Sequence, residues 1–288
     1  MVERMSFAKG SRARTLFIIG NYLFMIFLIF LMTIPIIKVL SDSLDRSAFY
    51  GISLIPNKFS FNAYEAVLSD PTLIRPFFVS VYVTIVGSFL AMLLITMGAY
   101  VLTQKDIPGR TLFIYMILVS MVFNAGMIPV YLLYRGLGLL NTLWAVIFPL
   151  LLNAFNLILM KNFFLEIPPS LIEAAEIDGC SPMGIFWRIV LPMSKPALAS
   201  IGLFVIVAYW NDFFHYVIYI TDENLYNFQV RLRELVLADD FSAVAGKQVF
   251  GRSLQNAVII IAMLPVMILY PFLQKYFVAG VNLGAVKG

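Results

Sequence analysis

Six long runs of apolar residues, separated by shorter polar stretches, dominate the pattern of the chain. A helix needs roughly 20 apolar residues to cross the hydrocarbon core of a bilayer, and each of these runs is long enough. None alternates polar and apolar positions with a period of two, as the strands of a membrane β-barrel do. The pattern predicts an all-α membrane protein with a single domain over residues 1–288. The six transmembrane helices are expected at about 16–37, 77–102, 111–133, 143–164, 197–220 and 254–278.

The composition agrees with a membrane protein and excludes a soluble one. Hydrophobic residues make up 61% of the chain and charged residues only 12%, and the mean hydropathy is +0.91. Soluble domains are about half apolar and about a quarter charged, so this chain has too few polar side chains to cover a soluble fold. The first apolar run is also too long for the core of a cleaved signal peptide, which favours a retained first helix.

The basic N-terminus sets the expected orientation. Arg4, Lys9, Arg12 and Arg14 precede the first apolar run, and positive residues beside a span tend to stay in the cytoplasm. Six spans then put both termini in the cytoplasm, although the remaining loops add only a weak bias. The net charge of +4 is explained by residues at the edges of the lipid bilayer, and we expect no nucleic acid as a partner.

Few residues are present that could support catalysis or bind a metal. There is one cysteine, Cys180, and one histidine, His215, whereas a zinc site needs three or four ligands. The P-loop pattern G-x-x-x-x-G-K-[ST] does not occur, because the Gly-Lys pair at 246–247 lacks the leading glycine. We therefore expect a non-catalytic membrane subunit that holds no cofactor or metal itself.

A polar stretch at 165–196, between the fourth and fifth runs, is expected to form a cytoplasmic loop with structure of its own. Ser170 and Glu173 have the spacing of a capping box, which predicts a short helix at Leu171–Ile177. Gly179 is placed for the left-handed residue that follows the end of a helix. The residues therefore predict a short helix that ends in a sharp turn.

A second short helix is expected to follow the turn. Ser181 and Pro182 predict its start, since serine is a good N-cap and proline is favoured at the first helical position. Pro192 predicts its end. Leu171, Ala174, Ala175 and Phe186 give the loop an apolar side, and Glu173, Glu176, Asp178 and Arg188 give it a charged side. From these residues alone, a hairpin packed on its own helix bundle and a hairpin that docks on a partner are equally open.

The order and spacing of residues in this loop resemble the EAA motif of ABC-importer permeases. The motif reads E-A-A at 173–175, glycine at 179, and I-x-L-P at 189–192. The resemblance implies a type I ABC importer permease fold in the plasma (inner) membrane of a bacterial cell. It also implies a coupling helix that docks on a separate ATPase subunit. The residues implied in ATPase coupling are Glu173, Ala174, Ala175, Asp178, Gly179, Ile189, Leu191 and Pro192.

Three further stretches resemble the carbohydrate-uptake branch of these permeases, the maltose-type importers of oligosaccharides and polysaccharides. They are LIPNKFSFNAYEAVLSD at 54–70, GLGLLNTLWAVIFP at 136–149 and YPFLQKYFVAGVNLGAVKG at 270–288. The resemblance implies a second, homologous permease subunit, a dimer of ATP-binding subunits that carries ATP and Mg²⁺, and a periplasmic or extracellular solute-binding protein. An acidic solute such as alginate and a neutral oligosaccharide both stay open.

Polar residues within the fourth and fifth runs are candidates for the solute pathway, because polar groups inside a bilayer tend to face a pathway or the bundle interior. The candidates are Asn153, Asn156, Tyr209, Trp210, Asn211, Asp212 and His215. Amides and carboxylates can bond sugar hydroxyls, and aromatic rings can pack on sugar rings. Alternatively, the rings form an interfacial belt and the polar groups bond neighbouring helices.

Two other polar patterns have simpler explanations. Ser80, Thr84 and Ser88 recur every four residues in the second run, which favours close helix packing over a pathway. The charged outer loop Thr221–Arg252 is either a solvated loop or a contact for the solute-binding protein or an acidic solute.

Three rival functions follow from other sequence patterns. An ion-coupled secondary transporter would need acidic residues at mid-membrane in several spans, and only Asp212 comes close. An intramembrane enzyme would need a catalytic constellation, which a single histidine beside Asp212 does not supply. A permease for amino acids or metals would share the EAA motif but not the sugar-type segments.

Overall fold

The computed structural model describes residues 12–46, 53–123, 125–237 and 251–284. Across these residues the chain is helical and forms no strand, apart from one isolated bridge between Asp45 and Phe59, so the all-α prediction is confirmed. The basic residues Arg4 and Lys9 and the loop residues Asp239, Asp240 and Lys247 lie outside the described part. The chain divides into two compact units, residues 1–67 with 239–260 and residues 68–238 with 261–288.

The first unit contains α1 (Arg12–Ser43), most of α2 (Asn62–Ser69) and the start of α14 (Gly251–Gly284). The apolar side chains of α1 are exposed along its length, as expected for a helix that faces lipid or another subunit. Polar residues at the end of α1 are buried instead. Asp42 pairs with Lys38 at 2.6 Å, and Asp45 accepts hydrogen bonds from the backbone amides of Asn57 (2.7 Å) and Lys58 (3.1 Å).

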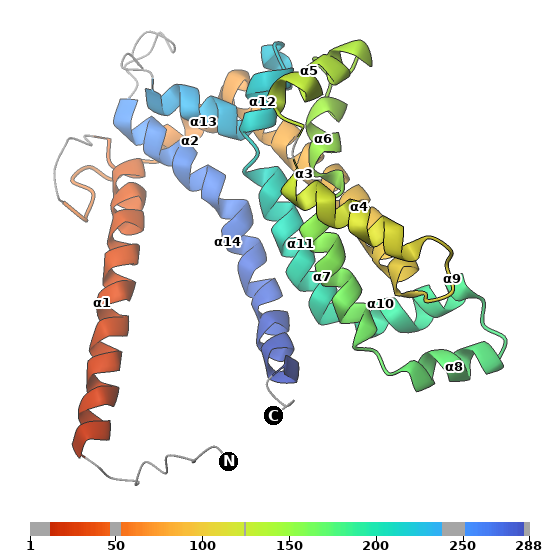
Figure 1. Ribbon diagram of the computed structural model, residues 1–288. Coiled ribbons are helices and arrows are strands. Elements are labelled where there is room, and N and C mark those ends of the chain that lie inside the picture. The colour runs from red at the N-terminus through yellow and green to blue at the C-terminus, as the bar shows by residue number, and fades with distance from the viewer. Residues whose placement is uncertain (1–11, 47–52, 124, 238–250, 285–288) are drawn as a thin grey trace. The chain divides into compact units, whose positions relative to one another are not determined.

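The second unit is built around α3 (Pro71–Thr103), which begins at an Asp70 N-cap followed by Pro71. The other elements of this unit, besides the rest of α14, are α4 (Arg110–Val122), α5 (Met127–Gly136), α6 (Trp144–Leu151), α7 (Ala154–Leu165), α8 (Pro169–Ile177), α9 (Pro182–Ile185), the π-helix η1 (Phe186–Val190), α10 (Leu191–Met193), α11 (Lys195–Trp210), α12 (Phe214–Tyr219), the 3₁₀ helix η2 (Glu223–Leu225) and α13 (Phe228–Leu237). Helices α3, α7 and α11 run alongside one another, with α8 to α10 near one end and α5, α12 and α13 near the other (Figure 1).

Only three described helices are long and apolar enough to cross a membrane unbroken: α1, α3 and α14. The predicted fourth span is bent by 45° between α6 and α7, and the predicted fifth span ends at Trp210 and resumes in α12. Pro149 within α6 and the Asn153 cap of α7 explain the first break, because each removes or redirects a backbone hydrogen bond. The count of six spans therefore depends on treating each bent pair as one span, and it stays a prediction.

Small residues let α3 and α11 approach closely. Ser80, Thr84, Gly87 and Ser88 are all buried on α3, in agreement with the packing stripe predicted for this helix. A Cβ atom added to Gly87 would lie only 2.5 Å from Cε1 of Tyr209 on α11, so glycine leaves the space that the tyrosine ring fills. The stripe thus belongs to the core that holds the two helices together.

Candidate functional site

The predicted coupling loop folds as two short helical segments from Pro169 to Met193, here called the α8–α10 hairpin. The first segment begins earlier than the capping box predicted. Pro168 is the N-cap and makes no side-chain cap bond, while Ser170 lies inside α8. The capping-box prediction is therefore wrong, because the extended backbone of Pro168 followed by Pro169 at the first helical position starts the helix one turn ahead of Glu173.

The turn after α8 has the geometry predicted for Gly179. This residue has φ of +77°, its amide donates to the carbonyl oxygen of Glu176 at 3.0 Å, and the amide of Cys180 donates to that of Ala175 at 2.9 Å. These two bonds define a Schellman turn, in which a left-handed residue satisfies the last carbonyl groups of the helix. The direction in which the chain leaves α8 is thus fixed by backbone bonds.

The second segment starts as predicted and ends later. Ser181 caps it by accepting a bond from the Gly184 amide at 3.2 Å, and Pro182 follows. The helix then widens into the π-turn η1 and continues past Pro192 to Met193, so the prediction that Pro192 ends it is wrong. Pro192 lies in the first turn of α10, a position where the missing N–H costs little.

Buried side chains attach the hairpin to the rest of the second unit. Ala175, Ile185 and Phe186 are buried in the core of this unit. Tyr100, near the end of α3, donates its hydroxyl to the carbonyl oxygen of Pro182 at 3.0 Å and packs its ring 5.1 Å from that of Phe186. The hairpin therefore has an inner face that is held by α3.

The outer face of the hairpin mixes apolar and acidic side chains. Ile177 is 87% exposed at the end of α8, and Leu171 is also exposed, together with Glu173, Ala174 and Asp178. Leu171 and Ala174 thus do not share one face with Ala175 and Phe186, as the predicted apolar side of the loop required, because only the latter two are buried. Of the remaining motif residues, Ile189 and Leu191 are half-buried against the core and Pro192 is exposed.

Tyr209 and Trp210, two candidates for the pathway, are buried in the second unit. The Tyr209 hydroxyl donates to the carbonyl oxygen of Ile147 at 2.8 Å, and Nε1 of Trp210 donates to that of Ala262 at 3.0 Å. Both polar atoms therefore point into the protein. The adjacent Asn211 is the C-cap of α11 and is exposed.

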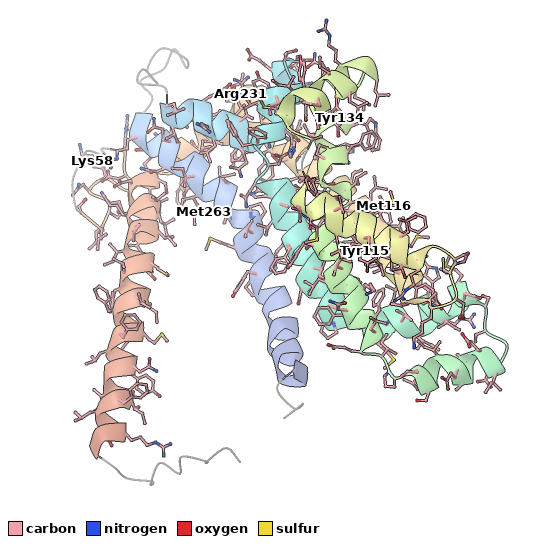
Figure 2. The ribbon with its side chains drawn as sticks, in the orientation of Figure 1. Lys58, Tyr115, Met116, Tyr134, Arg231 and Met263 are labelled. Carbon is pink, nitrogen blue, oxygen red and sulfur yellow. The ribbon has the colours of Figure 1, made fainter. Side chains whose placement is uncertain are left out.

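Asp212 and His215 come together at the break between α11 and α12. Oδ1 of the buried Asp212 lies 2.9 Å from Nδ1 of His215, while Oδ2 is buried and has no hydrogen-bond partner within the described ranges. The His215 ring stacks on Tyr219 at 6.0 Å, and Tyr219 contacts Tyr134 of α5 at 4.8 Å. Tyr134 and Arg231 mark this end of the unit in Figure 2.

Asn227, which was not singled out in the sequence, closes this break. Its side chain is fully buried, donates to the carbonyl oxygen of Asp212 and accepts from the amide of Val230 at 3.0 Å. It thus joins the start of α12 to the start of α13. A single asparagine in a loop has no periodic pattern around it, so only the tertiary structure reveals this role.

Asn153 and Asn156 are arranged differently from the prediction. A continuous helix would put both on one face, but Asn153 is the exposed N-cap of α7, and its Oδ1 accepts from the amide of Asn156 at 3.0 Å. Asn156 itself is buried. The two residues therefore stabilise the break between α6 and α7 rather than forming one polar stripe.

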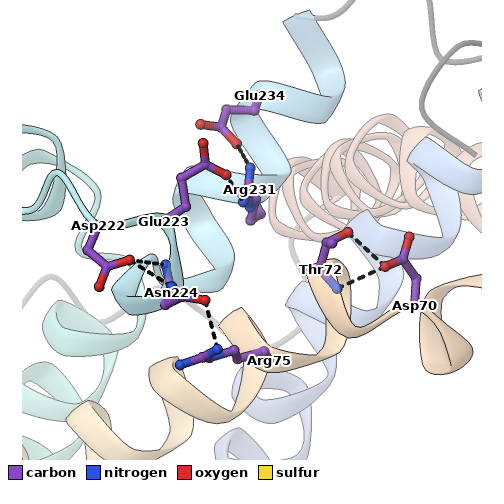
Figure 3. A network of polar contacts seen from close by, with 8 residues as sticks. All are labelled: Asp70, Thr72, Arg75, Asp222, Glu223, Asn224, Arg231 and Glu234. Carbon is purple, nitrogen blue, oxygen red and sulfur yellow. Dashed lines mark hydrogen bonds and ion pairs between the residues drawn. The ribbon is translucent and has the colours of Figure 1, made fainter.

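A polar network covers the segment between α12 and α13 (Figure 3). Arg231 binds Glu223 and Glu234, each at 2.7 Å, and Arg75 of α3 donates to Asn224 at 2.7 Å. Burial acts to lower the pKa of the Arg231 guanidinium, but the hydrogen bonds that it donates to Glu223 and Glu234 outweigh burial, and the pKa is raised above its ordinary value. Arg231 is thus a permanent cation that engages two carboxylates.

No cluster of three or more His, Cys, Asp or Glu side chains suited to a metal ion occurs in the part of the chain that the structure describes. Two surfaces are candidate sites: the outer face of the α8–α10 hairpin, and the polar, aromatic region around α12 and α13. They lie near opposite ends of α11 (Figure 1).

Comparison with known proteins connects this arrangement to a family. The family model described as "Binding-protein-dependent transport system inner membrane component" matches residues 10–283. The polygalacturonan/rhamnogalacturonan transport system permease protein YtcP of Bacillus subtilis (strain 168) is 40% identical over 276 residues, which cover 93% of this chain and 96% of that protein. Protein LplC of the same organism is 39% identical over 287 residues, 97% of each chain.

A solved structure shows the same fold. It is described as the crystal structure of a bacterial ABC transporter involved in the import of the acidic polysaccharide alginate, and one of its chains matches with a TM-score of 0.86 and 33% identity. The match covers 93% of this chain and 98% of that chain. The resemblance first indicated by the EAA motif is confirmed by these matches. The chain belongs to the family of inner-membrane components of binding-protein-dependent transport systems.

Proposed function

We propose that this protein is the permease subunit of an ATP-driven importer of oligosaccharides and that it forms half of an alternating-access pathway. Family membership supports the permease role, and the named substrates of YtcP and of the alginate transporter support a carbohydrate. A second permease subunit would supply the other half of the pathway. A dimer of ATP-binding subunits would carry ATP and Mg²⁺, and a solute-binding protein would deliver the sugar.

The observation that carries the coupling part of the proposal is the two-sided α8–α10 hairpin. Its inner face is fixed to α3 through Tyr100 and Phe186, and it continues into α11 through a bend of 83° at Ser194. Its outer face presents Ile177, Glu173 and Asp178 for contact. Since the turn at Gly179 is fixed by two backbone bonds, a force applied to α8 is passed to α3 and α11.

The transport cycle then follows from this attachment. ATP binding would close the two ATPase subunits and draw the hairpins of both permeases together. The movement of α3 and α11 would open the pathway toward the solute-binding protein, and hydrolysis would reset it. Because the hairpin would contact the ATPase, we propose that the hairpin and both termini lie in the cytoplasm and that α12 and α13 lie at the outer side of the membrane. An ion-coupled mechanism is not favoured, because the family works with ATP-driven partners.

The test is a charge placed on the outer face of the hairpin. Ile177→Asp is expected to abolish co-purification of the ATPase and solute-stimulated ATP hydrolysis by the complete transporter. Ile55→Asp is the matched control, since Ile55 is 78% exposed but lies far from the hairpin in sequence, and it should change neither. A chain that purifies without an ATPase and still transports sugar in the absence of ATP would overturn the proposal.

A further inference from the structure

A hollow of about 260 Å³ lies between the break after α11 and helix α13. One side is formed by Phe213 and Val217, and the other by Tyr226, Arg233 and Glu234. We call it the α13 pocket. It is smaller than most ligand sites, which measure roughly 300–1,000 Å³, so it suits a single sugar ring better than a whole chain.

Arg233 is held in this pocket by an aromatic contact. Its Cζ atom lies 4.5 Å from the centre of the Phe213 ring, within the range of a cation–π interaction. The residue is nevertheless exposed, and it forms no ion pair with any residue that the structure describes. A guanidinium group that has no ion-pair partner can bind a carboxylate through two parallel hydrogen bonds.

The neighbouring carboxylates are already engaged. Glu234, which lines the same pocket, binds Arg231 at 2.7 Å, and Glu223 binds the other side of Arg231 (Figure 3). Asp212, next to Phe213, is buried and directed at His215. Among the residues that the structure describes, these three carboxylates each have a partner other than Arg233, and the guanidinium of Arg233 forms no ion pair.

We propose that the α13 pocket binds a uronate ring of an acidic oligosaccharide, with the sugar carboxylate on Arg233 and the apolar face of the ring against Phe213 and Tyr226. This inference rests on the proposed function and narrows its substrate to acidic oligosaccharides. The pocket provides one exposed cation, an apolar wall that includes Phe213, Val217 and Tyr226, and space for one ring. Arg233 covers one face of the Phe213 ring and Arg231 covers one face of the Tyr226 ring, so the sugar would use the remaining surface of this wall. A neutral sugar would use the aromatic surface but would leave the charge of Arg233 without a partner.

The test uses the complete transporter in proteoliposomes, with its partner permease, its ATPase and its solute-binding protein. Stimulation of ATP hydrolysis is titrated with tetragalacturonate and alginate tetrasaccharide, and with the same oligomers after chemical reduction of their carboxyl groups to hydroxymethyl groups. Arg233→Gln is expected to raise the half-saturating concentration of the acidic oligomer about tenfold or more, as expected when a charge-assisted hydrogen bond is lost. For the reduced oligomer, the half-saturating concentration should be about the same with the unmodified transporter and with Arg233→Gln.

Two variants control for charge and for folding. Arg135→Gln removes an exposed arginine outside the pocket and should leave the half-saturating concentration unchanged. Arg233→Lys keeps the charge but not the planar group, and we expect the half-saturating concentration of the acidic oligomer to rise several-fold. This variant tests the proposal even if the glutamine variant does not assemble. Docking of the loaded binding protein is measured separately by co-sedimentation, and should be the same for all variants.

The outcomes separate this inference from the proposed function. If no oligosaccharide stimulates the unmodified transporter, the proposed function itself fails. If oligosaccharides stimulate it but charged and reduced oligomers act alike, the pocket is not a uronate site. The same conclusion follows if Arg233→Gln and Arg135→Gln change the half-saturating concentration of the acidic oligomer equally. A higher half-saturating concentration together with weaker docking of the solute-binding protein would also overturn the inference, because Arg233 would then contact that protein.

Discussion

The ring of Tyr209 fills the space that a side chain on Gly87 would occupy, since a Cβ atom at Gly87 would lie 2.5 Å from Cε1 of the ring. The hydroxyl of the same tyrosine is fixed by Ile147, so the ring has little freedom to move away. This contact brings α3 and α11 together, the two helices to which the α8–α10 hairpin is attached.

Gly87→Ala is therefore expected to destabilise the protein by about 1–3 kcal/mol, the usual range for overpacking a core. Gly20→Ala is the control, because no atom lies within 4 Å of a Cβ at that position on α1. Thermal unfolding in detergent, followed by aggregation or by intrinsic fluorescence, measures the difference. Equal midpoints for the two variants would show that the Tyr209 ring can shift at no cost.

Gly179→Val is expected to weaken coupling by straining the turn after α8. The left-handed conformation, with φ of +77°, costs a residue with a side chain about 1–2 kcal/mol, and more for a β-branched one. Gly179→Asn should be tolerated better, since asparagine adopts this conformation more readily. The measurement is the amount of ATP hydrolysed per sugar imported.

Gly138→Val provides the matched comparison for Gly179. Gly138 has φ of +68°, and like Gly179 it has no atom within 4 Å of an added Cβ. It lies just beyond α5, so the same strain is introduced near the other end of the unit. Loss of coupling by both valine variants alike would mean that backbone strain in general, and not the hairpin turn, is responsible.

Asn227→Ala is expected to destabilise the second unit by about 1–3 kcal/mol for each buried backbone group that loses its partner. The carbonyl of Asp212 and the amide of Val230 would both be left without the asparagine side chain. Asn227→Asp keeps the acceptor for Val230 but buries a carboxylate and turns its second oxygen toward the carbonyl oxygen of Asp212, so a larger loss than for alanine is expected. Thermal unfolding of the two variants measures this order, and the reverse order would contradict the assigned bonds.

The orientation of the hairpin can be measured by cysteine labelling after Cys180→Ser. Ile177→Cys and Leu237→Cys place single thiols at exposed positions on α8 and α13. A membrane-impermeant maleimide is expected to label position 177 only in inverted vesicles and position 237 only in spheroplasts. Labelling of position 177 in intact spheroplasts would reverse the proposed topology.

The sequence predicted the helical membrane fold and the hairpin well, because both depend on local patterns. Long apolar runs and the Ser181, Pro182 and Gly179 signals act over a few residues. The breaks in the spans were missed because hydropathy averages over about 20 residues, whereas the break at Asn153 depends on one capping bond. The break after Trp210 is stabilised by Asn227, a residue from a different element.

The solute pathway stays a prediction. The sequence could not show that Tyr209 and Trp210 bond inward, because their partners lie far away in sequence. In the sequence, Arg233 is one of several charged residues in the predicted outer loop Thr221–Arg252. Its contact with Phe213 joins two elements, and no spacing rule within either element predicts it.

Helix α11 has the hairpin at its first residue and the α13 pocket just beyond its last, so the two proposed contacts are joined by about 24 Å of helix. If this helix connects them, thermodynamic linkage requires the connection to act in both directions. The factor by which bound ATP changes the affinity of the pocket for a uronate must equal the factor by which the bound uronate changes the affinity of the ATPase for ATP. With the proposed topology, nucleotide binding measured at the ATPase would then report on occupancy of the α13 pocket across the membrane.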